Sequence, residues 1–309
     1  MSSICLIFIY NHRFDKNIEK LETMYKGRFS NIFHLVPFYD GSKENVIPVY
    51  ETSFYFQGYI PQAIHRFWDE KYTHYFFVGD DVLLHPQLNE NNLLEKLSVN
   101  DQTCFFPDLW ESLDKRSYSW VNTFPALNAF YLADALHHHS INWKSHFPPR
   151  EEAIKRFSNQ GISIGKIQFR DFRKNAVFPT KRKALLHYLK LVVMRRRSLP
   201  YPMATGYSDI FLLPATEMKS FAHLCEITRQ MRLWVEVAIP TIAISTLKNI
   251  KFEKDAGVKG TTYWANDNEQ ELRERESVCD FKLSKLYKTF KHNELYIRPI
   301  KLSKWNINE

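Results

Sequence analysis

The sequence predicts an α/β protein whose mixed, mainly parallel sheet is flanked by helices. Three apolar runs of strand length, Cys5–Ile9, Ile32–Phe38 and His74–Val78, alternate with segments of helical periodicity. Each run ends in polar residues, and ligands of such sheets bind beyond the carboxyl ends of the strands. We therefore expect the functional residues at that edge.

The helical segments follow the strands in order. Asp15 is expected to cap a helix that runs to about Lys26, with Ile18, Leu21 and Met24 on its buried face. The later elements are expected to be a helix from Tyr59 to Glu70, strands over Thr103–Pro107, Ala126–Leu132 and Tyr207–Leu213, a helix over Ala215–Gln230 and a buried helix over Leu233–Thr246.

Composition excludes several classes of protein. With 309 residues, 44% hydrophobic and 25% charged, the chain can bury a large core and is not a disordered protein. Its four cysteines are scattered, which favours neither a zinc site nor a disulfide framework and suits a reducing compartment. We find neither a signal peptide nor an apolar run long enough to span a bilayer, and so expect a cytoplasmic protein.

Positive charge is concentrated in two segments. Residues 144–197 hold 15 Lys or Arg and three acids, a balance of +12 against +8 for the whole chain. Residues 281–309 hold seven Lys or Arg and two acids. Such asymmetry indicates an anionic partner, which is a membrane surface, a phosphorylated substrate or nucleic acid.

An acidic pair follows the third strand in the segment HYFFVGDDVLLHP. A nucleoside diphosphate would be repelled by Asp80 and Asp81 unless a divalent cation bound between them, and Mg²⁺ or Mn²⁺ prefers oxygen ligands. The pair is equally compatible with a solvated turn. The polar tips Tyr10-Asn11 and Tyr39-Asp40 are expected at the same edge.

FFVGDDVLLHP resembles the DxD motif of GT-A glycosyltransferases, and the upstream FQGYIPQAI is similar to the helix that precedes this motif in bacterial members. The resemblance implies a Rossmann-like GT-A fold and a UDP-sugar donor. It also implies that Asp81 binds Mn²⁺ or Mg²⁺ and that Asp80 contacts the ribose or a metal-bound water. Tyr10, Asn11 and Asp40 would then lie near the nucleoside.

Two further stretches resemble motifs of the same family. PYPMATGYSDIFLLP is similar to the Y-P-x-x-x-G-Y stretch on the acceptor side, and the acidic motif that follows it in the family corresponds to Glu236 in LWVEVAIP. Glu236 would be the catalytic base, although only one acid stands where the family has a Glu-Asp pair. A buried salt bridge to an arginine is the alternative role.

The C-terminal YIRPIKLSKW resembles a terminal H-P-(I/V)-K motif, with Arg298 in the place of the histidine. The third metal ligand would then be His292, the one histidine after Glu236. Alternatively, Arg298 and Lys301 neutralise the diphosphate themselves, since arginine binds phosphate oxygens in a bidentate manner.

These resemblances together imply an inverting transferase for a glycan or lipid-linked glycan acceptor in bacterial surface polysaccharide synthesis. Residues 1–139 would bind the nucleotide sugar, 140–199 would be a basic insertion, and 200–309 would form the acceptor side and a basic C-terminal segment. A retaining enzyme would use Glu236 only to contact the acceptor. The other hypotheses are a nucleotidyltransferase and a non-catalytic protein that binds membranes or nucleic acid on an α/β scaffold.

Within the insertion, Lys181–Ser198 combines basic clusters with apolar residues at helical spacing. This pattern suits an anionic membrane surface, where the protein would be peripheral, or an ordinary helix packed on the sheet. No nucleic-acid recognition motif supports the third partner class. The histidines 137–139 are adjacent, cannot all face one metal, and are expected at a surface or helix end.

Overall fold

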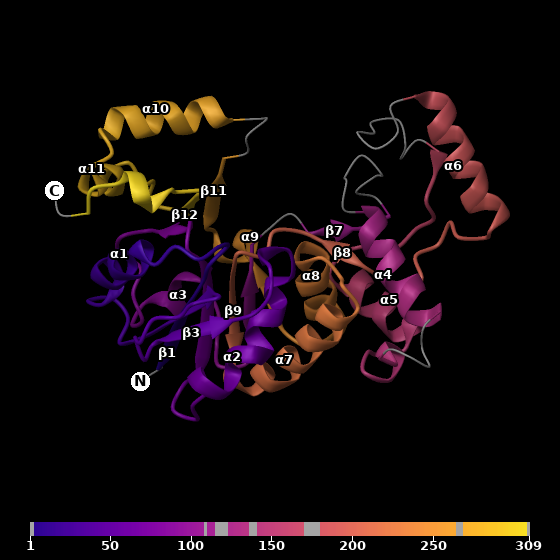
Figure 1. The fold of residues 1–309 in the computed structure, drawn as a ribbon, viewed down its shortest axis with the longest axis horizontal. Coiled ribbons are helices and arrows are strands. Elements are labelled where there is room, and N and C mark those ends of the chain that lie inside the picture. Colours follow the sequence, from indigo (N-terminus) through magenta and orange to yellow (C-terminus); the bar gives the residue numbers. More distant parts are fainter. Residues whose placement is uncertain are drawn as a thin grey trace.

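The computed structural model describes residues 3–107, 110–114, 123–135, 141–169, 180–263 and 268–307. Its centre is a mixed sheet of seven strands with helices on both faces, which confirms the predicted fold class at the level of an α/β protein (Figure 1). Strands β4, β1, β2 and β3 run parallel, whereas β9 runs antiparallel between β4 and β6. In sheet order the strands are β10 (Ile250–Phe252), β6 (Cys104–Phe106), β9 (Ile210–Pro214), β4 (His74–Gly79), β1 (Ile4–Ile9), β2 (Asn31–Pro37) and β3 (Val46–Val49).

Strand β1 shows why the sheet is covered on both faces. Its residues are apolar throughout and fully or almost fully buried, and successive side chains point to opposite faces. Cys5, Ile7 and Ile9 join one core cluster, whereas Leu6 and Phe8 join the other. Burial of both faces excludes water from the sheet except at its edges, where the polar tips lie.

Helices complete the two cores. The core cluster on one face of the sheet contains side chains of α2 (Tyr59–Phe67), α7 (Ala215–Gln230) and α8 (Val235–Thr246), and it extends to α4 (Thr123–Ala135) at one end of the molecule (Figure 1). On the other face pack α1 (Lys16–Tyr25), α3 (Leu93–Lys96) and α11 (Leu283–Lys288). The other helices of the described residues are α5 (Arg150–Asn159), α6 (Lys181–Val193), α9 (Glu253–Ala256), α10 (Glu269–Cys279) and the 3-10 turns η1 (Ser53–Gly58), η2 (Trp143–Ser145) and η4 (Leu302–Lys304).

Most predicted elements are confirmed within a few residues, but one strand is wrong. The segment expected as a strand over Ala126–Leu132 lies inside helix α4. It is rich in Ala and Leu and has no β-branched residue, so its intrinsic preference is helical. Asp15 precedes α1 as expected but makes no side-chain cap, because its carboxylate pairs with Arg13 at 3.0 Å.

A second sheet was not predicted. It contains β11 (Lys259–Thr262), β12 (Glu294–Arg298) and β5 (Leu83–Leu84), and joins the C-terminal segment to the residues after β4. Sequence analysis missed all three strands. Each is short, and β11 and β12 also carry polar residues, so their apolar pattern is weak. A third, two-stranded sheet pairs β7 (Glu111–Ser112) with β8 (Ala204–Thr205).

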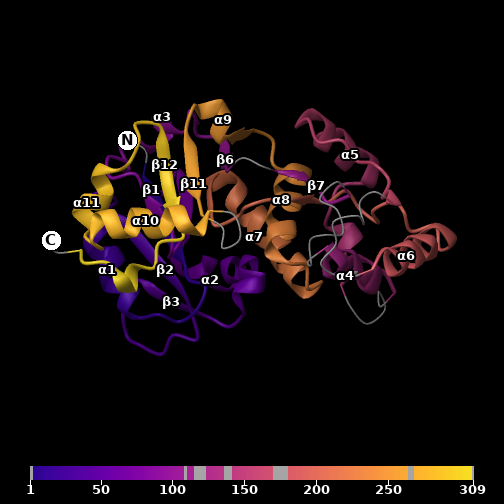
Figure 2. The same ribbon diagram turned by 90° about the horizontal axis from the view of Figure 1, so that it is seen from above.

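The basic insertion and the C-terminal segment lie at opposite ends of the molecule. Two perpendicular views place α4, α5 and α6 at one end and α10 and α11 at the other (Figures 1 and 2). Among the helices that the structure describes, none has the length and apolar character needed to cross a bilayer. The histidines 137–139 lie outside the described residues.

Candidate functional site

Three aspartates, Asp80, Asp81 and Asp209, stand at the edge of the sheet where β1 and β4 end. Asp80 and Asp81 follow β4, as the apolar run of that strand predicts. Asp209 precedes β9, and because β9 is antiparallel to β4 its first residue lies beside the last of β4. The backbone N–H of Gly79 donates to the carbonyl oxygen of Asp209 at 2.7 Å, which fixes the two segments against each other.

Asp80 holds the end of β4 to the loop that follows β1. Its Oδ1 accepts the backbone N–H of Asn11 at 3.3 Å, and its Oδ2 accepts the side-chain amide of Asn17 at 3.2 Å. Burial raises the pKa of Asp80 to about 7, and repulsion from Asp81 adds to the shift. Asp80 therefore links the end of β4 to Asn11 and Asn17, the two residues that donate hydrogen bonds to its carboxylate.

Asp81 differs from Asp80 in having an unsatisfied carboxylate oxygen among the described residues. Its Oδ1 is enclosed and has no hydrogen-bond partner among the described residues. Burial raises the pKa of Asp81 to about 6. The positive charge of the nearby Arg298 lowers this pKa, and the negative charge of Asp209 raises it further. A Cβ added at Gly79 would lie 3.1 Å from Oδ1, so the glycine lets this carboxylate fold back over the strand end. An enclosed carboxylate oxygen without a partner is costly and marks a place for a cation or donor.

Arg298 supplies the positive charge of this cluster. Its Nη2 lies 3.2 Å from Oδ2 of Asp209, and its guanidinium stacks on the ring of Tyr207 at 4.2 Å. The neighbouring backbone is tied to the acidic pair, since the N–H of Ile300 donates to the carbonyl oxygen of Asp81 at 2.7 Å. Strand β12 thus places Arg298 beside the carboxylate of Asp209.

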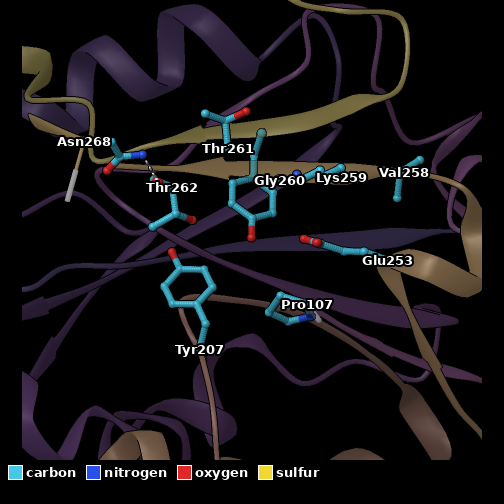
Figure 3. Close-up of a pocket in the computed structure, with 10 residues that line it drawn as sticks. Pro107, Tyr207, Glu253, Val258, Lys259, Gly260, Thr261, Thr262 and Asn268 are labelled. Atoms are coloured by element: carbon cyan, nitrogen blue, oxygen red, sulfur yellow. Dashed lines mark hydrogen bonds between the residues drawn. The ribbon is translucent and has the colours of Figure 1, made fainter. Parts of the chain in front are cut away.

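A cavity of about 470 Å³ lies beneath β11 (Figure 3), and one of the residues that line it is Tyr207, on whose ring Arg298 stacks. The Tyr207 hydroxyl and the Glu253 carboxylate point into it in this view. It is lined by Pro107, Tyr207, Glu253, Val258, Lys259, Gly260, Thr261, Thr262, Asn268 and Tyr296. Pro107 and Glu253 follow β6 and β10, so the cavity extends along the same sheet edge.

Aromatic hydroxyl groups give the cavity its polar character. The rings of Tyr207 and Tyr296 have centroids 6.2 Å apart. The Tyr207 hydroxyl is buried and has no hydrogen-bond partner in the described part of the chain. The Tyr296 hydroxyl bonds with Glu253 and Thr262. Ring faces, hydroxyls and a carboxylate together match the apolar and polar surfaces of a sugar.

Glu236, the predicted base, stands in the first turn of α8 and is half-buried. Its carbonyl oxygen accepts the N–H of Gly206 at 3.0 Å, three residues before Asp209. It is not among the residues that line the cavity, whereas Glu253 is. The apolar sequence around Glu236 suggested a buried carboxylate, which would be costly. Its position in the first turn of α8 leaves it only half-buried, so that cost is smaller.

Three other predicted residues lie away from the carboxylates or take a different role. The ring of Tyr10 is fully buried in the core, where its hydroxyl bonds with Nδ1 of His34 at 3.0 Å. Asp40 is exposed and pairs with Arg13 at 2.5 Å. His292 is exposed and lies before β12, at the opposite end of that strand from Arg298. Strand β12 spans about 13 Å from Glu294 to Arg298 at about 3.3 Å per residue, and His292 lies in the turn before it, too far from Arg298 for one metal ion.

Lys301 and Asn11 lie near the acidic pair, Lys301 as the neighbour of Ile300 and Asn11 through its own backbone. Lys301 is exposed and follows Ile300, which binds the Asp81 backbone. Asn11 contributes its backbone N–H to Asp80. Both can therefore contact a ligand at this edge, in contrast to the buried ring of Tyr10.

The carboxylates of this site suit Mg²⁺ or Mn²⁺ only if a bound substrate supplies further oxygen ligands. In the described part of the chain, no group of three His, Cys, Asp or Glu side chains is arranged to hold a metal ion. Asp81, whose enclosed oxygen has no partner among the described residues, and Asp80 offer oxygen ligands, and Mg²⁺ is commonly bound by one or two carboxylates plus substrate phosphates. The residues fit a cation that arrives with a diphosphate.

Asp209 and Glu253 were not recognised from the sequence as site residues. Asp209 stands directly before an apolar strand. An acid in that position lies beside the end of β4 only because β9 runs antiparallel to β4, and the sequence does not give the strand direction. Glu253 follows the short strand β10, which pairs with β6 far away in the sequence. Neither carboxylate carries a local motif.

Comparison with known proteins adds no assignment at this point. No protein-family model matches the chain, and no curated protein matches it in sequence. The site geometry and the three short motifs therefore carry the functional argument.

Proposed function

We propose that this protein is a glycosyltransferase of the GT-A type, which moves a sugar from a nucleotide diphosphate sugar, a UDP-sugar by resemblance, to an acceptor hydroxyl. One observation carries the proposal: an enclosed oxygen of Asp81 has no partner among the described residues, and the nearby Arg298 stacks on Tyr207, which lines a cavity. Carboxylates, a guanidinium and a polar cavity at the carboxyl edge of an α/β sheet suit a metal-bound diphosphate with an attached sugar.

The charges of the site residues suggest where each part of the donor would bind. Arg298 and Lys301 would neutralise the diphosphate, and Asp81 with Asp80 would hold Mn²⁺ or Mg²⁺, whose chemistry is to stabilise the charge of the departing diphosphate. The sugar would enter the cavity and lie against Tyr207 and Tyr296. Asn11 would approach the nucleoside through its position beside Asp80.

In the reaction, an acceptor hydroxyl oxygen attacks the anomeric carbon. The bond from that carbon to the diphosphate oxygen breaks, and its electron pair stays with the diphosphate. A carboxylate takes the hydroxyl proton, as general base catalysis requires. Glu253 is better placed for this role than Glu236, because its carboxylate points into the cavity (Figure 3). The acceptor, a glycan or lipid-linked glycan, is proposed from the resemblance.

Release of a nucleoside diphosphate tests the proposal. Purified protein with Mn²⁺ and a panel of nucleotide sugars should release UDP from one member, and Asp81→Asn should lower the rate by about 10²-fold or more. Asp101→Asn, an exposed acid remote from the site, is the matched control and should keep full activity. Pyrophosphate release from a nucleoside triphosphate would instead identify a nucleotidyltransferase.

The base is tested separately. Glu253→Gln should reduce kcat by about 10²–10⁴-fold with little change in donor affinity, whereas Glu236→Gln should retain most of the activity. The reverse pattern would return the role of base to Glu236. If UDP and Mn²⁺ raise the melting temperature of the wild type and of Asp81→Asn equally, the diphosphate site lies elsewhere.

A further inference from the structure

Helix α6 presents an apolar stripe to solvent although its opposite face is already packed. Side chains spaced by three, four and seven residues lie on one face of a helix. The exposed members and their exposed fractions are Leu185 (43%), Leu186 (59%), Leu189 (47%), Val192 (40%) and Val193 (82%), followed by Met194 (44%) just after the helix.

The inward face of α6 is fixed by its own contacts. Tyr188 and Leu191 pack against the larger core cluster, and the ring of Tyr188 lies 5.7 Å from Phe169. After the helix, the guanidinium of Arg196 stacks on Tyr131 at 4.5 Å, and Nε of Arg197 donates to the carbonyl oxygen of Ile167 at 3.1 Å. Rotating the helix to bury the apolar stripe would break these contacts.

Basic residues surround the stripe. The segment from Lys181 to Arg197 contains seven Lys or Arg and no Asp or Glu. On the helix itself, Lys181, Arg182, Lys183 and Lys190 are all exposed. Both views place α6 at the periphery of the molecule, where a flat surface could approach it (Figures 1 and 2).

We propose that α6 docks on an anionic lipid bilayer, with its leucine and valine stripe in the headgroup region and its Lys and Arg side chains on the lipid phosphates. A basic helix with an aliphatic face is the arrangement that such an interface binds. Single-stranded nucleic acid would need aromatic platforms for its bases, which this stripe lacks. A second copy would bring two sets of like charges together. The inference is independent of the proposed reaction.

Vesicle sedimentation tests the proposal with the full chain. The protein should bind vesicles of phosphatidylcholine with phosphatidylglycerol and should not bind phosphatidylcholine alone. Leu186→Gln with Leu189→Gln, which leaves the charge unchanged, should weaken binding about tenfold or more. Arg182→Gln with Lys190→Gln should do the same and reduce the salt dependence. Val278→Gln on α10, where Val278 is 76% exposed, is the control and should bind as the wild type does.

A fluorescent probe reports the depth of the helix directly. The four native cysteines are buried, so Val193→Cys can be labelled selectively with an environment-sensitive dye. Anionic vesicles should shift its emission to the blue, and oligonucleotides should not. Equal melting temperatures of the variants exclude misfolding as the cause of lost binding. The proposal is overturned if the leucine variants bind anionic vesicles as the wild type does, or if the wild type binds oligonucleotides and not vesicles. It is also overturned if the leucine substitutions convert a dimer to a monomer.

Discussion

Nη2 of Arg298 lies 3.2 Å from Oδ2 of Asp209, in an ion pair that joins the C-terminal strand β12 to the start of β9. Both side chains are largely buried, with exposed fractions of 13% and 14%. The same guanidinium lowers the pKa of Asp81 against the effect of burial. One arginine therefore balances two carboxylates at the sheet edge.

Arg298→Met should destabilise the protein more than the loss of one surface ion pair would. Removing the guanidinium leaves the carboxylates of Asp209 and Asp81 enclosed without their cation, which costs about 3 kcal/mol. Urea unfolding at neutral pH measures the loss. Adding Asp209→Asn to Arg298→Met should recover part of it, and no recovery would show that the ion pair does not carry the effect.

Asp80→Asn should change the pH dependence of stability. The pKa of Asp80 is raised to about 7 by burial, so between about pH 4 and 7 the folded protein keeps a proton that the unfolded chain releases. Stability therefore falls as pH rises through that range. Without divalent cations, the variant should be more stable than the wild type at about pH 8, by on the order of 4 kcal/mol, and similar near pH 4.

The amide that Asp80→Asn introduces can be accommodated, because Asn17 Oδ1 is buried without a partner among the described residues. After a flip of the Asn17 amide, this oxygen can accept the N–H of the new side chain. Thermal unfolding over the same pH range provides the measurement. A stability difference that is the same at every pH would show that Asp80 does not titrate in the folded protein.

Gly79→Ala should weaken nucleotide binding more than it weakens the fold. The added Cβ would lie 3.1 Å from Asp81 Oδ1 and 3.3 Å from Asp209 Cβ, so both acidic side chains must shift by a few tenths of an ångström. We expect about tenfold weaker binding of UDP with Mn²⁺ by calorimetry. Gly27→Ala meets no atom within 4 Å and is the matched control.

Tyr207→Phe should leave stability unchanged or raise it by about 1 kcal/mol, because the hydroxyl it removes is buried without a partner in the described part of the chain. If this hydroxyl binds the sugar, the KM for the donor should rise about tenfold, while UDP alone should bind as before. Thermal unfolding and steady-state kinetics provide the two measurements. A loss of stability would show that the hydroxyl already has a partner in the folded protein.

Local sequence patterns predicted the core of the fold well. Helix α7 begins and ends where predicted, and the strands around Leu6 and Phe76 are buried as continuous apolar runs require. The same patterns identified the sheet edge and the acidic pair of Asp80 and Asp81. They failed for α4, where an apolar run short enough for a strand lies inside a helix, because apolar length does not separate the two.

The sequence alone determined which residues end the apolar strands, because burial acts on each strand through its own side chains. Only the tertiary structure decided which charges meet those residues. Asp209 reaches Asp81 because β9 runs antiparallel to β4, and Arg298 reaches both because β12 pairs with β5 directly after the acidic pair. His292 precedes the same strand and lies at its far end. Pairing between distant strands depends on the packing of the whole chain, and no local pattern around Asp81 or Arg298 encodes it.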